Sequence, residues 1–206
     1  SGLAIRRLLE SVIVDKRIKA ENLLLGDKNA LIIAARAHGY GNMYETTIEC
    51  SACDQPQQYD FDLSSLKIKR VSEEYMKEKK IQLTEQNTFL FLLPKTDYMI
   101  EVRLLNGADE ENLAKTSEHK KKRGLPESSM TDFLRTLIVS VNAVSDPNSL
   151  NGFINSLPAI QARYIRKIYD NLVPSLDMSH HFKCEACAHE GILEVPLTSD
   201  FFWPNS

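Results

Sequence analysis

The sequence has no long apolar run and no excess of basic residues. Its longest mainly apolar stretches, Phe89–Leu93 and Leu137–Val141, are far shorter than the roughly 20 residues that cross a bilayer. The formal net charge is −3 over 206 residues, whereas a general nucleic-acid binder carries a strong positive excess. We therefore expect no membrane segment, and we expect contact with nucleic acid to be unlikely.

Recognisable catalytic and nucleotide-binding motifs are also lacking. The sequence contains neither Gly-x-Ser-x-Gly nor Gly-x-x-x-x-Gly-Lys-Ser/Thr, no Gly-x-Gly-x-x-Gly after a strand, and no His-Glu-x-x-His. The glycines of Gly39-Tyr-Gly41 are too sparse to cradle a phosphate and indicate the end of a helix. We therefore predict a protein that is not an enzyme, with no catalytic residues and no small-molecule substrate.

Cysteine is scarce, and its placement is the strongest signal in the chain. All four cysteines fall into two Cys-x-x-Cys pairs, Cys50/Cys53 and Cys184/Cys187, and β-like runs flank each pair. One such turn supplies half of a tetrahedral zinc site, and two supply a whole one. Because four thiolates fill the coordination sphere, we predict one structural Zn²⁺ per chain on these four residues.

Other states of the cysteines stay open at this point. The pairs are much farther apart than in a self-contained zinc ribbon, where about 15–20 residues separate them. Reduced thiols without metal, disulfides and a dithiol redox protein are the alternatives, although no signal peptide is recognisable and reduced cysteines suit a reducing cytoplasm. His180, His181 or His189 could replace one cysteine ligand, or could be polar residues on an exposed ribbon.

Hydrophobic periodicity predicts an α+β fold: a mainly helical body with β-hairpins, joined to two Cys-x-x-Cys ribbons that form one zinc-ribbon-like site. The composition, 43 % hydrophobic and 26 % charged, is that of a soluble globular protein. We predict a single domain over residues 1–206, with the ribbon part at about 44–62 and 178–197 and the helical body at about 107–174. The predicted helices cover residues 3–14, 27–38, 112–122, 131–144, 149–156 and 158–172, and the strands cover 44–50, 57–61, 88–93 and 98–105.

Two further groups of residues have a structural and a functional interpretation. The aromatic residues Phe201, Phe202 and Trp203 either dock on the chain's own core or insert into a partner, since aromatics dominate interface energetics. The basic run Lys120–Arg123 either complements the dipole of a helix end or contacts a phosphate or a partner. With Arg163, Arg166 and Lys167, this run is the basis of an alternative function, a zinc-ribbon regulatory module that binds nucleic acid.

Two blocks of the sequence resemble a known family. The first runs from Leu25-Gly-Asp-Lys-Asn-Ala-Leu through Tyr40-Gly and Tyr44-Glu to the Cys50 pair. The second contains the Cys184 pair, His189-Glu, Val195-Pro-Leu and the terminal aromatics. Both are similar to the small baseplate-hub and hub-assembly proteins of T4-type contractile-tailed bacteriophages. Two residues depart from a zinc-ribbon pattern: Ala188 stands where such ribbons commonly have glycine, and Asp54 occupies the matching place in the first pair.

The resemblance implies a non-enzymatic protein used in building the central hub of a phage tail baseplate. Its partners would be other hub or tail proteins, bound through protein–protein contacts. It would act in the host cytoplasm during assembly, as a chaperone, or stay in the baseplate of the virion as a hub subunit.

Overall fold

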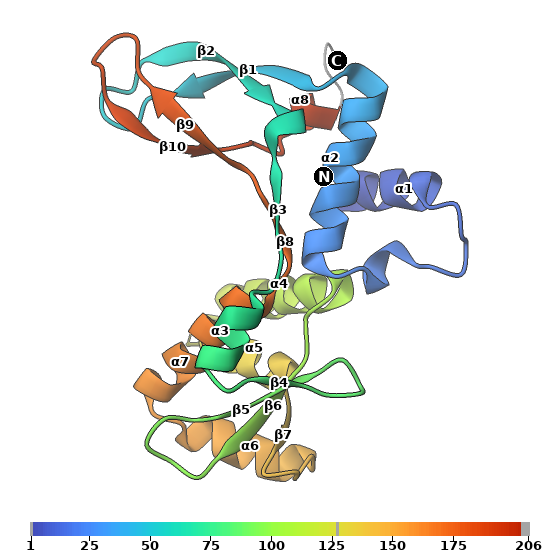
Figure 1. Ribbon diagram of the computed structural model, residues 1–206, viewed down its shortest axis with the longest axis vertical. Coiled ribbons are helices and arrows are strands. Elements are labelled where there is room, and N and C mark those ends of the chain that lie inside the picture. Colours follow the sequence, from blue (N-terminus) through green and yellow to red (C-terminus); the bar gives the residue numbers. More distant parts are fainter. Residues whose placement is uncertain (1, 127, 203–206) are drawn as a thin grey trace. The chain divides into compact units, whose positions relative to one another are not determined.

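The computed structural model describes residues 2–126 and 128–202, and their contacts divide the chain into two compact units (Figure 1). The hairpin unit comprises the described residues of Ser1–Arg17, Gly26–Lys69 and Ser175–Ser206. The sheet unit comprises Ile18–Leu25 and the described residues of Arg70–Pro174. The first unit is therefore built from the two ends of the chain and the second from its middle.

Two β-hairpins dominate the hairpin unit. Strands β1 and β2 pair antiparallel, as do β9 and β10, and each hairpin carries one Cys-x-x-Cys turn at its tip (Figure 1). The elements of this unit are α1 (Gly2–Val12), α2 (Leu25–Tyr40), β1 (Met43–Glu49), β2 (Pro56–Asp62), a 3₁₀ turn (Leu63–Ser65), β3 (Lys67–Lys69), β8 (Ser175–Asp177), β9 (Ser179–Lys183), β10 (Glu190–Glu194) and α8 (Ser199–Phe202).

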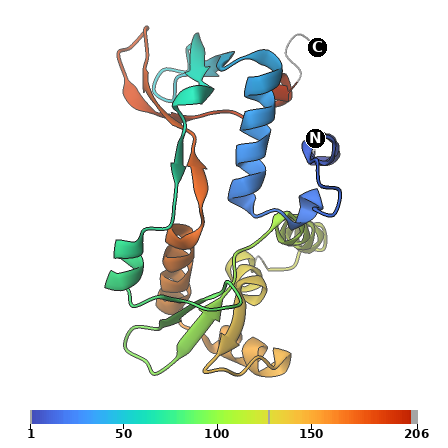
Figure 2. The same ribbon diagram turned by 45° about the vertical axis from the view of Figure 1, so that its right-hand side comes forward.

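The alternation of side chains in β1 and β2 determines which face of this hairpin is buried. Tyr44 and Phe61 are register partners and are almost fully buried, while their neighbours along each strand are more exposed. A period of two is typical of a strand with one face against a core. Strands β3 and β8 form a second antiparallel pair and lie side by side in both ribbon views (Figure 2).

The sheet unit contains a four-stranded antiparallel sheet in the order β4-β5-β6-β7, together with several helices. One face of the sheet packs on helices α5 to α7 in a core that includes Phe91, Ile100, Leu137, Ile165 and Leu172, each at most 1 % exposed. The elements are a 3₁₀ turn (Ala20–Asn22), α3 (Glu73–Glu78), β4 (Gln82–Leu83), β5 (Phe89–Leu92), β6 (Met99–Val102), α4 (Gly107–Lys122), α5 (Ser129–Leu137), β7 (Ile138–Val141), α6 (Pro147–Ser156) and α7 (Ala159–Leu172).

The helix predicted over residues 131–144 is wrong in its second half. Helix α5 ends at Leu137, and Ile138–Val141 form the edge strand β7, which pairs with β6. The run Ile-Val-Ser-Val is rich in β-branched residues, which favour strands. A short apolar run is ambiguous from periodicity alone, and here pairing with β6 decides the outcome.

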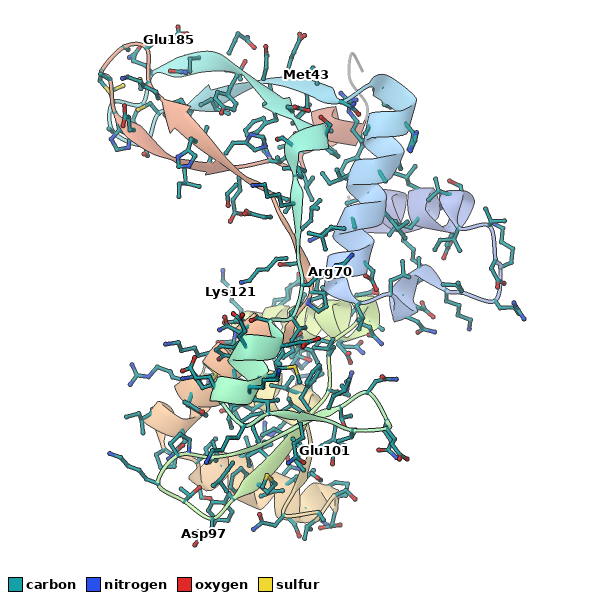
Figure 3. All side chains as sticks on the ribbon, in the orientation of Figure 1. Met43, Arg70, Asp97, Glu101, Lys121 and Glu185 are labelled. Atoms are coloured by element: carbon teal, nitrogen blue, oxygen red, sulfur yellow. The ribbon has the colours of Figure 1, made fainter. Side chains whose placement is uncertain are left out.

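A polar group inside the sheet unit has its hydrogen bonds satisfied locally. The Glu101 carboxylate on β6 accepts hydrogen bonds from Thr88 Oγ1 and Ser140 Oγ, both at 2.6 Å. These hydroxyl donors, Ser140 first, lower the pKa of Glu101 despite its partial burial. Two hydroxyl groups therefore stabilise the charged carboxylate in place of the water that it loses. Figure 3 labels Glu101.

Mixed helix and antiparallel sheet is the predicted fold class, and this part of the prediction is confirmed. The predicted helical body at 107–174 also contributes strand β7 to the sheet unit. The division into two compact units describes the contacts within the chain; that these units form a single domain over 1–206 stays a prediction. None of the helices in the described part of the chain combines the length and the apolar character needed to cross a bilayer.

Helix α4 begins at a charged capping box. The side chain of Asn106 accepts a hydrogen bond from the backbone N–H of Asp109, and the Asp109 carboxylate accepts one from the backbone N–H of Asn106. The same carboxylate accepts two hydrogen bonds from Arg103, each at 2.7 Å. Burial raises the pKa of Asp109, but the bonds from Arg103 and Asn106 outweigh it and lower the pKa.

We predict that Asp109→Asn lowers the free energy of unfolding at pH 7 by about 2 kcal/mol, because it removes a charge-assisted pair. A carboxyl whose pKa is lower in the folded state stabilises the protein above its unfolded pKa, and this contribution is lost as pH falls through the folded pKa. The difference between wild type and Asp109→Asn should therefore shrink in acid. Urea unfolding at pH 7 and pH 3 measures it, with Asp97→Asn in an exposed turn (Figure 3) as the control. An undiminished difference at pH 3 would contradict the ionic explanation.

Candidate metal centre

The two Cys-x-x-Cys turns have the same backbone hydrogen bonds. In the first, the N–H of Cys50 donates to the carbonyl of Gln55 (3.1 Å), and the N–H of Asp54 donates to the carbonyl of Cys50 (2.9 Å). In the second, the N–H of Cys184 donates to His189 (2.8 Å), and the N–H of Ala188 donates to Cys184 (2.9 Å). Each turn therefore closes the end of its hairpin and holds both of its cysteines on the same short loop.

The residue after each cysteine pair adopts left-handed backbone. Asp54 has φ 55° and Ala188 has φ 59°. These are the positions at which the sequence departs from glycine, and the conformation shows why a zinc ribbon favours glycine there. Aspartate tolerates this region better than most residues, whereas an alanine carries a steric cost of roughly 1–2 kcal/mol.

The two turns meet, and all four sulfur atoms lie within 4.8 Å of one another. The Sγ atoms of Cys50 and Cys187 are 3.8 Å apart, and those of Cys53 and Cys184 are 3.7 Å apart. A tetrahedral zinc ion with Zn–S bonds of about 2.3 Å holds its sulfurs about 3.8 Å from one another. The sulfurs are too far apart for disulfides, whose S–S bond is about 2.05 Å, and none of the four cysteines is disulfide-bonded. The arrangement fits a single tetrahedral metal ion.

Protein contacts next to the sulfurs also join the two hairpins. Cys50 and Cys184 are buried in a small apolar cluster with Phe182. The hydroxyl of Tyr59 donates to the carbonyl of His181 (2.7 Å), and it does so from a strand of the other hairpin. The backbone N–H of Glu185, which Figure 3 labels at the hairpin tip, donates to Gln57 Oε1 (3.1 Å). Each hairpin therefore donates a hydrogen bond to the other close to the four sulfurs.

The thiols of the cluster differ in acidity. The backbone N–H of Ala52 lowers the pKa of Cys50, and backbone N–H groups, first that of Cys187, lower the pKa of Cys184 to about 7. A backbone N–H also lowers the pKa of Cys53, but the neighbouring thiols, Cys187 first, together with burial outweigh it and raise the pKa to about 12. One cysteine of each pair, Cys50 or Cys184, therefore has a lowered pKa. A bound cation would offset the repulsion of four thiolates at this spacing.

None of the neighbouring histidines belongs to the cluster of possible ligands in the described part of the chain. His181 is exposed, as expected for a ribbon surface, whereas His180 and His189 are half-buried. His180 packs edge-on against Phe61, with the ring centroids 5.0 Å apart, and His189 Nε2 lies 3.4 Å from Ser51 Oγ. Among the described residues, the group that could hold a metal ion here therefore consists of the four cysteines.

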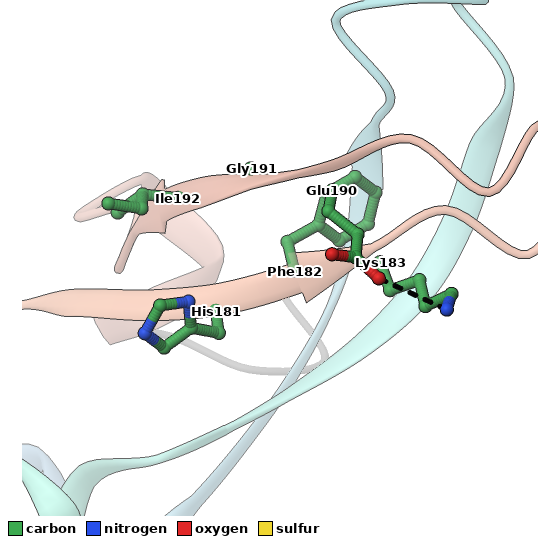
Figure 4. A pocket seen from close by; sticks show the side chains of 6 residues that line it. All are labelled: His181, Phe182, Lys183, Glu190, Gly191 and Ile192. Carbon is green, nitrogen blue, oxygen red and sulfur yellow. Dashed lines mark ion pairs between the residues drawn. The ribbon is translucent and has the colours of Figure 1, made fainter.

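The solvent side of the second hairpin is a shallow hollow with no catalytic arrangement among the residues that line it. Lys183 and Glu190 are register partners and form an exposed ion pair of 3.1 Å (Figure 4). Beside them His181 faces Ile192, which is 69 % exposed. These residues lie on the face of β9 and β10 opposite Phe182, so they do not reach the sulfurs.

The described C-terminal aromatics pack within the hairpin unit. Phe201 is fully buried and meets the ring of Tyr44 edge-on at 4.9 Å. The guanidinium of Arg36 lies over the rings of Tyr44 and Phe201 at 5.7 and 5.8 Å. Phe202 is also buried, whereas Trp203 lies outside the described residues. Phe201 and Phe202 therefore pack on the chain's own core, which is one of the two interpretations of these aromatics. Contact of this segment with a partner stays a prediction.

The basic residues of the alternative function lie in the sheet unit. Lys120, Lys121 and Arg166 line the same hollow beside α5, although α4 and α7 supply them from distant parts of the sequence. Two of the three have carboxylate partners, since Lys120 pairs with Asp132 and Arg166 with Asp170.

Sequence reasoning identified the four cysteines but missed the groups that hold them. Tyr59 and Gln57 reach the second hairpin across 122 and 128 residues of sequence. Neither belongs to a local pattern that indicates such a partner. Arg36 is another buried residue without a sequence signal, 7 % exposed among aromatic rings.

Comparison with known proteins gives one match. The family model described as "T4 bacteriophage base plate protein" matches residues 2–203, nearly the whole chain. No curated protein and no solved structure matches it.

We predict that Ala188→Gly raises the free energy of unfolding by about 0.5 to 1 kcal/mol. Glycine removes the cost of a left-handed alanine, while the larger entropy of the unfolded chain offsets part of the gain. Ala186→Gly in the same turn is the matched control, because Ala186 does not have positive φ, and this change should be neutral or destabilising. Urea unfolding of both variants measures the difference. An Ala188→Gly variant no more stable than Ala186→Gly would contradict the strain.

Proposed function

Since this chain belongs to the T4 bacteriophage base plate protein family, we propose that it helps to build the central hub of a phage tail baseplate. The family match over residues 2–203 carries this proposal, because it covers both units of the chain. A hub subunit of the virion and an assembly chaperone in the host cytoplasm are the two forms of the proposed role. In either form the protein acts through contacts with other baseplate or tail proteins.

The proposed role needs a rigid surface rather than a reaction. A site with four thiolate ligands has no open coordination position for a substrate, which is the feature that separates structural from catalytic zinc. The family is named for a structural assembly, and this supports a protein that is not an enzyme. The four cysteines would then stabilise the hairpin unit, and the surfaces of the chain would bind partners.

We further propose that Cys50, Cys53, Cys184 and Cys187 hold one structural Zn²⁺. Sulfur separations of 3.7 and 3.8 Å support this assignment, as does the nearly identical backbone of the two turns. Thiolate ligands suit zinc among the common divalent ions. The bound ion would supply charge compensation and would link two hairpins that are distant in the sequence.

Binding of nucleic acid is the weaker candidate. The hollow with Lys120, Lys121 and Arg166 supplies positive charge, but Asp132 and Asp170 neutralise part of it. The net charge of the chain, −3, adds a general repulsion toward phosphate.

Purified under reducing conditions, the protein should contain one zinc ion per chain by elemental analysis. Cys184→Ser should lose the metal and lower the melting temperature of the hairpin unit strongly, because metal binding contributes directly to folding. Ala186→Ser, which adds a hydroxyl in the same turn, should keep both. Zinc should also leave as the pH falls, since protons compete for the thiolates. Fully reduced protein that binds no zinc would contradict the assignment.

Deletion of the gene from the phage should prevent assembly of complete baseplates, and supply of the protein in trans should restore them. Electron microscopy of infected-cell extracts measures the fraction of tails with a complete hub. The purified protein should also bind at least one separately purified hub or tail protein. Normal tails after deletion, with no binding to any of these proteins, would overturn the proposed function.

A further inference from the structure

The sheet unit has a hollow whose chemistry the metal centre does not use. It has a volume of about 540 Å³ and lies between helices α4, α5 and α7. Leu113, Leu125 and Phe133 provide its apolar lining. Leu125 follows the basic last turn of α4, and 50 % of its surface is exposed. The side chain of Leu125 is therefore accessible to a partner that enters the hollow.

Positive charge surrounds this apolar lining. Lys120, Lys121 and Arg166 line the hollow, and Asp132 is the one carboxylate among the described residues of its lining. Asp132 is already used, because it pairs with Lys120 at 2.5 Å and with Arg135 at 3.4 Å. Cations therefore outnumber carboxylates among the described residues that line the hollow, although Asp170, outside the lining, pairs with Arg166.

Two of the cations are available to an acidic partner. Lys121 is exposed and forms no ion pair with the described residues; Figure 3 labels it. Arg166 is held in place by Phe133, whose ring centroid lies 4.3 Å from the guanidinium carbon, and its Nε bonds to Asp170. Its two terminal nitrogens make no hydrogen bond within the described part of the chain. An arginine fixed in this way loses little entropy when it binds a carboxylate.

We propose that this hollow binds an acidic segment of a partner protein, with an apolar side chain of that segment seated against Leu125 and carboxylates facing Lys121 and Arg166. This inference rests on the proposed function, because it supplies the surface through which the chain would contact a baseplate protein. Charge complementarity determines the kind of partner and its on-rate, and the apolar contact adds affinity. A nucleic acid fits less well, since its sugar-phosphate backbone offers no large aliphatic side chain to pack against Leu125.

Site-directed crosslinking tests the surface directly. The photoreactive residue benzoylphenylalanine replaces Leu125 in the full chain, which is supplied to cells infected with the deletion phage and then irradiated. We expect a crosslink to a segment of a baseplate protein that is rich in Asp and Glu. The same residue at Ile160, which is 72 % exposed in the sheet unit, should give no such product.

Charge reversal shows whether the hollow is responsible. Lys121→Glu should reduce the yield of this crosslink about fivefold or more. Lys77→Glu, an exposed lysine on α3 with the same change of charge, should leave the yield unchanged. Both variants should keep the melting temperature and the metal content of the wild type, because neither side chain is buried.

Several outcomes would overturn the inference: a yield at Leu125 no greater than at Ile160, a crosslink to nucleic acid or to a segment without excess carboxylates, or a crosslink insensitive to Lys121→Glu. Complementation separates this inference from the proposed function. If Lys121→Glu combined with Leu125→Asp restored complete baseplates as well as the wild type does, the hollow would be excluded, while the hub role would stand. If deletion left baseplates intact, the hub role would fail instead.

Discussion

The meeting of four sulfur atoms is the constraint on which the hairpin unit depends. The cysteines that approach one another at 3.7 and 3.8 Å are separated by 131 and 137 residues of sequence. Closing so long a loop costs conformational entropy, and this cost grows slowly with loop length. Contacts at the tips of the two hairpins must therefore offset this entropic cost. The hydrogen bonds of Tyr59 and Gln57 contribute to this alongside the sulfurs.

Much of this structure could be predicted from local chemistry. The two Cys-x-x-Cys turns lie at hairpin tips because Cys50 and Cys184 follow alternating strands, and the residues that replace glycine, Asp54 and Ala188, do adopt positive φ. The candidate ligands could also be identified, since two Cys-x-x-Cys turns together can supply a whole tetrahedral zinc site. What local chemistry leaves open is the choice between partners that are distant in sequence. Ile138–Val141 could continue a helix or form a strand, and only its pairing with β6 decides between them.

The candidate ligands could be identified from local sequence, whereas the residues around them could not. The sequence around Tyr59 does not indicate that its hydroxyl donates to the carbonyl of His181, because this hydrogen bond forms only when the two hairpins meet. The convergence of Lys121 and Arg166 on one hollow is likewise a result of how α4 and α7 pack around α5. Each residue alone has the pattern of ordinary helix surface. Such a composite surface forms only in the folded chain.

The placement of the cysteines also affects the order in which the parts of the protein can fold during synthesis. Cys53 leaves the ribosome 131 residues before Cys184, a delay of roughly 7 to 26 s at 5–20 residues per second. During this interval the first hairpin has two thiols and no second pair, while the middle of the chain has time to form its own core. The hairpin unit is therefore the last part of the molecule to close. A chain interrupted before residue 184 would therefore carry the first pair of candidate ligands without the second.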